Sequence, residues 1–101
     1  MTTVNTINVE SLDQYYGNPA YVIIDLRSPG DYARGHLKGA INIPYENLEE
    51  YGKLPKNKTL ILYCERGNTS LFTARELMKK GYQTKSVVGG FRTYRGHNLE
   101  F

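Results

Sequence analysis

Short apolar runs alternate with segments of helical periodicity along most of the chain. Runs rich in β-branched and aromatic residues predict buried strands at 21–25, 40–43, 60–63 and 85–88. Helical patterns lie between these runs, at 9–16, 29–34, 45–51 and 70–80. Strand and helix alternate, and strands that are apolar on both faces need cover on both faces. The pattern therefore predicts an α/β fold with a mostly parallel sheet.

Cys64, the only cysteine, lies where the 60–63 run ends and a polar, glycine-containing segment leads toward the helix at 70–80. This order places a thiol at the carboxyl end of a buried strand and beside a helix N-terminus, where a thiolate is best stabilised. A lone cysteine is more often a small apolar core residue, but the strand-loop-helix context favours function. Asp25 ends another strand, and the carboxyl ends of parallel strands meet at one edge. The sequence therefore predicts Cys64 as a nucleophile with Asp25 near it.

Composition and charge narrow the class of protein. The 101 residues are 40% hydrophobic and 23% charged, which is ordinary for a folded protein and predicts one domain over residues 1–101. The net charge is +3 and the basic residues are scattered, so no nucleic-acid partner is expected. No apolar run is long enough for a membrane span and the first residues lack a signal-peptide pattern, so the expected location is cytoplasmic.

A single cysteine also limits the chemistry of the site. It excludes an internal disulfide and dithiol redox exchange, both of which need a second thiol. Cys64, His36 and His97 do not make a convincing set of four ligands for structural zinc. We therefore expect no metal and no cofactor.

The residues after Cys64 have the features of an anion-binding loop. A short loop that curls back to a helix start can direct several N–H groups at one centre. Gly67 lets this turn close, and Arg66 adds a charge that can stabilise a thiolate or hold an incoming oxyanion. The side-chain oxygens of Asn68 and Thr69 are expected to cap the start of the helix.

Three segments, in this order along the chain, resemble the signatures of the rhodanese-like sulfurtransferases. They are the stretch 24–44 with its Gly35-His36 pair, the loop 64–69 (Cys-Glu-Arg-Gly-Asn-Thr) and the closing 88–91 (Val-Gly-Gly-Phe). The resemblance covers nearly the whole chain. It implies a rhodanese-like fold, in which a central five-stranded, mostly parallel sheet has helices on both faces. It also implies a short first strand near Ile7.

The resemblance implies a reaction as well. In that family the loop cysteine attacks the outer sulfur of a donor such as thiosulfate and holds a persulfide until a thiophilic acceptor, cyanide or a thiol, removes it. Carried onto this chain, Cys64 would hold the sulfur, and the backbone N–H groups of residues 65–70 would cradle its charge. Ping-pong kinetics would follow. The small donor and acceptor, and a protein acceptor of sulfur, are the partners implied.

Charged residues near Cys64 bear on the donor and on the fold. Arg66 stands where thiosulfate-using relatives often carry a basic side chain, whereas Glu65 repels an anion unless it turns outward or pairs with Arg66. Asp25 and Arg27 are expected to form a structural pair rather than to supply a base. His36 is expected to bond to backbone rather than to take the thiol proton.

The remaining motifs leave several interpretations open. Gly89 and Gly90 allow a close approach to the cysteine loop, a tight turn, or both, and Phe91 is expected to begin a short helix that packs on the core. A Cys-x5-Arg phosphatase is disfavoured because Ser70 occupies the position of its arginine. A non-catalytic, regulatory rhodanese-like module remains the alternative to a thiosulfate sulfurtransferase.

Overall fold

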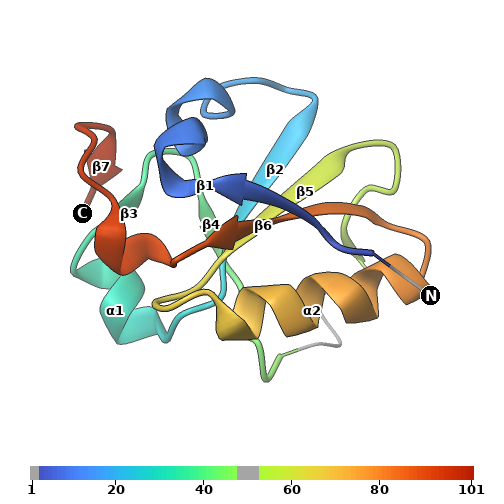
Figure 1. Ribbon diagram of the computed structural model, residues 1–101. Coiled ribbons are helices and arrows are strands. Elements are labelled where there is room, and N and C mark those ends of the chain that lie inside the picture. The colour runs from blue at the N-terminus through green and yellow to red at the C-terminus, as the bar shows by residue number, and fades with distance from the viewer. Residues whose placement is uncertain (1–2, 48–52) are drawn as a thin grey trace.

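The computed structural model describes residues 3–47 and 53–101 and contains a five-stranded parallel sheet in the order β1-β6-β5-β2-β4 (Figure 1). Its strands are β1 (Asn5–Asn8), β2 (Tyr21–Asp25), β4 (Ile41–Asn42), β5 (Thr59–Tyr63) and β6 (Gln83–Val88). The helical elements are η1 (Val9–Gln14), α1 (Pro29–Ala33), α2 (Asn68–Lys79) and η3 (Phe91–Thr93). A second, antiparallel pair joins β3 (His36–Leu37) to β7 (Leu99–Glu100). The α/β fold with a five-stranded parallel sheet is confirmed.

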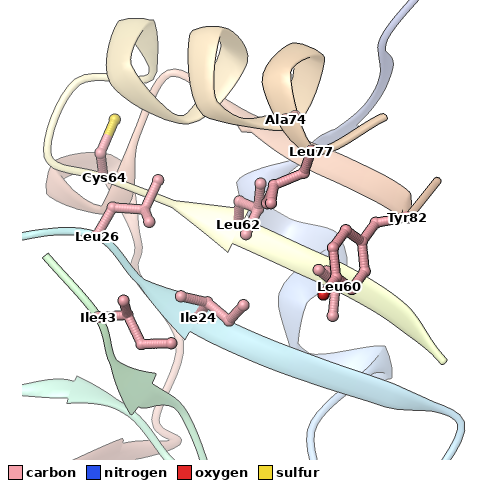
Figure 2. Packing of buried hydrophobic residues seen from close by; sticks show 9 residues of the cluster. All are labelled: Ile24, Leu26, Ile43, Leu60, Leu62, Cys64, Ala74, Leu77 and Tyr82. Atoms are coloured by element: carbon pink, nitrogen blue, oxygen red, sulfur yellow. The ribbon is translucent and has the colours of Figure 1, made fainter. Parts of the chain in front are cut away.

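Successive residues of the central strands point to opposite faces, so the sheet separates two apolar layers. On one face Ile24 and Leu62 pack with Ala74 and Leu77 of α2 (Figure 2). The opposite layer gathers residues of η1, β2, β5, β6 and η3, namely Val9, Leu12, Ile23, Ile61, Val87 and Phe91. Burying one such side chain fully contributes about 1.5–3 kcal/mol, so these layers supply most of the driving force for the fold.

The observed elements match the predicted ones with shifted ends. The short strand near Ile7 is β1, α2 begins two residues before Ser70, and β4 keeps only the middle of the predicted run at 40–43. The helical segment predicted over 9–16 is present as a 3₁₀ helix, η1, which ends two residues earlier, at Gln14. Val9 and Leu12 are its buried residues, and a spacing of three matches the three residues per turn of a 3₁₀ helix.

Two further segments differ from the sequence pattern. The predicted helix over 45–51 lies partly outside the described residues, and its described part is a turn closed by the Asn47 N–H on the Pro44 carbonyl at 2.9 Å. The two-residue strand β7 was not predicted. It is exposed and too short to show an alternating pattern, so its pairing with β3 depends on a distant partner.

The register of the sheet brings the predicted site segments to one edge. Asp25 of β2 lies opposite Tyr63 of β5, so the chain leaves both strands at the same level. The Leu26 N–H donates to the Tyr63 carbonyl at 2.9 Å, which holds the two exits together. On the other side of β5, Leu62 pairs with Ser86, so the chain beyond β6 passes the cysteine loop.

Candidate active site

Cys64 follows the last residue of β5, and its sulfur points toward the start of α2 (Figure 2). The thiol is only 6% exposed. The Gly67 N–H donates to Sγ at 3.1 Å and the Ser70 N–H at 3.3 Å. These are two of the N–H groups expected over residues 65–70, and both favour a negatively charged sulfur.

Gly67 is the N-cap of α2, and its backbone adopts the left-handed conformation with φ of 100°. This position has no side-chain cap, so the expectation that Asn68 and Thr69 cap the helix is wrong. Both residues already lie within the first turn, beyond the position from which a side-chain oxygen reaches the free N–H groups. The sulfur of Cys64 takes the Ser70 N–H instead, and it therefore stands where a capping oxygen would.

Beneath the loop, a pair of buried hydroxyls fixes its shape. Ser70 Oγ donates to the Gly67 carbonyl at 3.1 Å and lies 2.9 Å from Ser86 Oγ. Since the Ser70 proton is directed at Gly67, Ser86 donates to Ser70. Ser86 is not among the site residues predicted from the sequence. Its signal was the alternation of Thr84 and Ser86 on the face of β6 that packs toward α2.

The chain after β6 closes over the same loop. The Phe91 N–H donates to the Cys64 carbonyl at 2.8 Å, and the Arg92 N–H donates to the Glu65 carbonyl at 3.2 Å. Gly90 has a φ of 79°, and a Cβ there would overlap the Glu65 carbonyl group. The structure thus shows both the close approach and the tight turn that Gly89 and Gly90 allow.

Asp25 and Arg27 form the expected pair beside the loop. Asp25 is fully buried, and Arg27 donates to its carboxylate from Nη2 at 2.8 Å and from Nε at 3.1 Å. Arg27 Nη2 also donates to the Gly35 carbonyl at 2.7 Å, and the guanidinium lies 4.8 Å from the Phe91 ring centre. Burial lowers the pKa of Arg27, but the hydrogen bond and charge of Asp25 outweigh it and raise that pKa, so Arg27 stays charged.

Glu65 turns partly outward, with its side chain 51% exposed, and its Oε1 lies 3.6 Å from Arg27 Nη1. The partner is therefore Arg27 rather than Arg66, which the sequence analysis had named. Arg66 is exposed. Sequence proximity pointed to Arg66, whereas the register of β2 and β5 brings Arg27 across the strand ends.

The two histidines take no part in the loop. His36 Nδ1 lies 2.8 Å from the Tyr32 carbonyl, which can only accept, so Nδ1 carries a proton. The His36 ring stacks on Tyr32 at 3.6 Å, and Nε2 lies 3.7 Å from Glu100. This is the backbone-bonded arrangement expected for His36, and His97 is exposed.

Two openings lead to Cys64. One is a cavity of about 280 Å³ lined by Leu26, Arg27, Ser28, Asp31, Tyr45, Glu46, Cys64, Glu65 and Thr69. The other, of about 210 Å³, is lined by Cys64, Glu65, Arg66, Asn68 and Thr69. Each can admit a small sulfur compound. Over residues 3–47 and 53–101, no three His, Cys, Asp or Glu side chains gather as metal ligands, and no helix could cross a membrane.

The fold is a parallel α/β sheet whose central strand is followed directly by a cysteine, with a helix start that directs N–H groups at the sulfur. Residues 8–97 match the model of the Rhodanese-like domain, and the chain belongs to this family. A rhodanese-like domain protein from Staphylococcus aureus has the same fold, with a TM-score of 0.86 at 22% identity over 97% of this chain and 98% of that one.

Two curated relatives carry sulfurtransferase names. The tRNA sulfurtransferase of Desulfurococcus amylolyticus is 40% identical over 86 residues, which make up 85% of this chain but only 17% of that protein. The thiosulfate sulfurtransferase GlpE of Coxiella burnetii is 33% identical over 79 residues, 76% of this chain and 74% of that protein. The chain therefore spans most of one relative's length and a small part of the other's.

Proposed function

We propose that this chain is a sulfurtransferase that carries a sulfane sulfur atom on Cys64 as a persulfide. The observation that carries the proposal is the pair of N–H groups, from Gly67 and Ser70, that donate to Cys64 Sγ. Membership of the rhodanese-like family and the names of the two relatives support sulfur transfer in general.

In the first half-reaction the Cys64 thiolate attacks the outer sulfur of thiosulfate or of a persulfide donor. A bond forms between Cys64 Sγ and that sulfur, and the donor's own S–S bond breaks. Its electron pair leaves with sulfite, or with a thiolate when the donor is a persulfide. The N–H groups of Gly67 and Ser70 stabilise the attacking anion, and the terminal sulfur of the new persulfide carries the charge toward the openings.

In the second half-reaction a thiolate or cyanide attacks the terminal sulfur of the persulfide. The Cys64 S–S bond breaks, its electron pair returns to Cys64, and the acceptor leaves as a persulfide or as thiocyanate. Because the donor's product leaves before the acceptor reacts, the kinetics are ping-pong. No general base is required, which suits a site in which His36 is bonded to backbone.

A reducing compartment suits this chemistry, and the proposal therefore includes a cytoplasmic location. A lone, nearly buried thiol escapes capture by a second cysteine of its own chain, since the sequence has none. The acceptor in the cell is either a small thiol or a protein thiol that reaches one of the two openings.

Intact-mass measurement after incubation with thiosulfate tests the proposal. We expect one added sulfur atom per chain, which cyanide or a thiol then removes. Cys64→Ser is the control and should gain none. If the wild-type chain gains no sulfur from thiosulfate or from a small persulfide, the catalytic proposal fails and the regulatory module is favoured.

A further inference from the structure

The two openings at Cys64 differ in charge. Among the residues that the structure describes, the lining of the larger one, the acidic cavity, includes three carboxylate side chains, Asp31, Glu46 and Glu65, and one cation, Arg27. The described lining of the smaller one, the loop opening, includes Glu65 and Arg66 as its charged residues. The formal charges of these described residues sum to −2 around the acidic cavity and to zero around the loop opening.

The cation of the acidic cavity is already paired. Arg27 directs Nε and Nη2 at the buried Asp25 and at the Gly35 carbonyl, while Nη1 faces Glu65. The guanidinium side chain is only 9% exposed. An anion entering the cavity would have to displace Glu65 to reach it.

The three carboxylates differ in how far a neighbouring cation neutralises their charge. Asp31 forms an ion pair at 2.8 Å with Arg34, which is largely in solvent, and such exposed pairs are weak. Glu65 shares Arg27 with Asp25 at the longer distance of 3.6 Å. Glu46 is exposed at the rim, next to Tyr45. The cavity therefore keeps a negative potential that opposes anions and attracts cations.

Leu26 and Tyr45 add an apolar wall to the same cavity. A short carbon chain can lie against this wall while its sulfur reaches Cys64 and a positive group at its other end faces the carboxylates. Aminothiols have this combination of groups.

Resting on the sulfurtransferase function proposed above, we infer that the acidic cavity receives a thiol acceptor that bears a positive charge a few atoms from its sulfur. An anionic donor such as thiosulfate then approaches through the loop opening, beside Arg66. The aminothiol attacks as its thiolate, forms a new S–S bond with the terminal sulfur and returns the electron pair of the broken bond to Cys64.

The test is single-turnover loss of the persulfide from loaded protein, followed by intact mass. Three acceptors of similar length are compared: cysteamine, 2-mercaptoethanol and 3-mercaptopropionate. Each rate is divided by the rate of the same thiol with a small-molecule persulfide at the same pH, because thiolates of different basicity differ in intrinsic nucleophilicity. We expect this normalised rate to be about three- to tenfold higher for cysteamine than for 3-mercaptopropionate, with 2-mercaptoethanol between them. The ratio should shrink in ~1 M salt, where the screening length is about 3 Å.

Variants connect the ratio to the cavity. Glu46→Gln should bring the ratio of the cysteamine rate to the 3-mercaptopropionate rate closer to one. Glu10 is an exposed glutamate of η1 that lines neither opening, so Glu10→Gln should leave this ratio unchanged. Arg66→Gln should slow loading from thiosulfate and keep the order of the acceptors. Equal normalised rates for the three acceptors, or an unchanged ratio in both Glu46→Gln and Asp31→Asn, would overturn the inference. A chain that never loads sulfur would instead contradict the proposed function, and loading is measured first.

Discussion

Helices α1 and α2 both begin after a strand of the parallel sheet, but different groups accept hydrogen bonds from their first N–H groups. Each follows a central parallel strand, β2 for α1 and β5 for α2, after a short turn at the same edge of the sheet. At α1 the N-cap is Ser28, whose side chain accepts the Asp31 N–H at 3.2 Å, and Pro29 follows. At α2 the N-cap is Gly67, which has no side chain, and the Ser70 N–H goes to Cys64 Sγ.

The difference shows how little separates an ordinary helix start from one that directs N–H groups at a thiol. At α1 a serine oxygen within the turn satisfies the helix start, and the nearby Asp25 takes the Arg27 N–H at 2.8 Å and the guanidinium. At α2 no residue of the cap supplies an oxygen, so the free N–H groups remain for a sulfur anion. The N–H groups that face Cys64 are therefore available because the helix has no side-chain cap, and no added functional group is needed to supply them.

The largest expected effect comes from Gly90→Ala, which would push the β6–η3 turn away from the loop. The new Cβ overlaps the Glu65 carbonyl and the φ of 79° is strained for alanine, so we expect unfolding to become easier by about 3 kcal/mol or more. Urea unfolding measures this. Gly17→Ala is the matched control, because its φ is 78° and no atom lies within 4 Å. A cost of about 1 kcal/mol is expected there, and equal costs at both sites would contradict the close approach.

Removing the hydroxyl beneath the loop should come next. Ser70→Ala leaves Ser86 Oγ buried without this partner and removes one of the two hydrogen bonds that the Gly67 carbonyl accepts, so stability should fall by about 1–3 kcal/mol. If the hydroxyl positions the N–H groups that donate to Cys64 Sγ, alkylation of Cys64 at a fixed pH should become slower as well.

A second hydroxyl of α2 serves as the control for that variant. Thr73 Oγ1 is buried with no hydrogen-bond partner among the described residues. Thr73→Val should therefore be neutral or stabilising and should keep the wild-type rate of Cys64 alkylation. An unchanged rate in Ser70→Ala would leave that serine a purely structural role.

The paired carboxyl ends of β2 and β5 can be tested through the pH dependence of stability. Burial, with the charge of Asp25, raises the pKa of Tyr63, which lies opposite Asp25 in the sheet. The unfolded chain then loses this proton first, so stability should be complete below about pH 10 and fall above it by up to about 1.4 kcal/mol per pH unit. In urea unfolding between pH 9 and 11, Tyr63→Phe should lose less stability per pH unit than the wild type. If both proteins lose stability equally with pH, other groups cause the loss.

The smallest effect is expected at the start of α1. Ser28→Ala removes the cap of α1 and should lower stability by about 1 kcal/mol. The rate of Cys64 alkylation at a fixed pH should stay that of the wild type, because the N–H groups that donate to the sulfur come from Gly67 and Ser70. A changed rate would show that the two helix starts are coupled, which the contrast between them does not predict.

Features encoded in neighbouring residues could be predicted from the sequence. The strand-loop-helix order around Cys64 and the pairing of Asp25 with Arg27 are local, since their partners lie a few positions apart. The cap at Asn68 and Thr69 was predicted wrongly, because the left-handed turn at Gly67 moves both residues into the helix.

Features that depend on strand register could not be predicted. Arg27 meets Glu65 because β2 and β5 are paired side by side, and Ser86 meets Ser70 because β6 lies beside β5. The pairing of β3 with β7 joins segments more than sixty positions apart. No periodicity within a segment encodes such a partner.

The place of β5 in the sheet has a consequence for how the protein loses activity. β5 is the central strand, with β6 on one side and β2 on the other, and its buried residues face both apolar layers. Its amide protons should therefore exchange with solvent only when the whole domain opens, later than those of the exposed β7. A thiol that directly follows this strand should keep its geometry until the fold itself is lost, so the fraction of chains that can load sulfur in the proposed reaction should report the fraction of folded molecules.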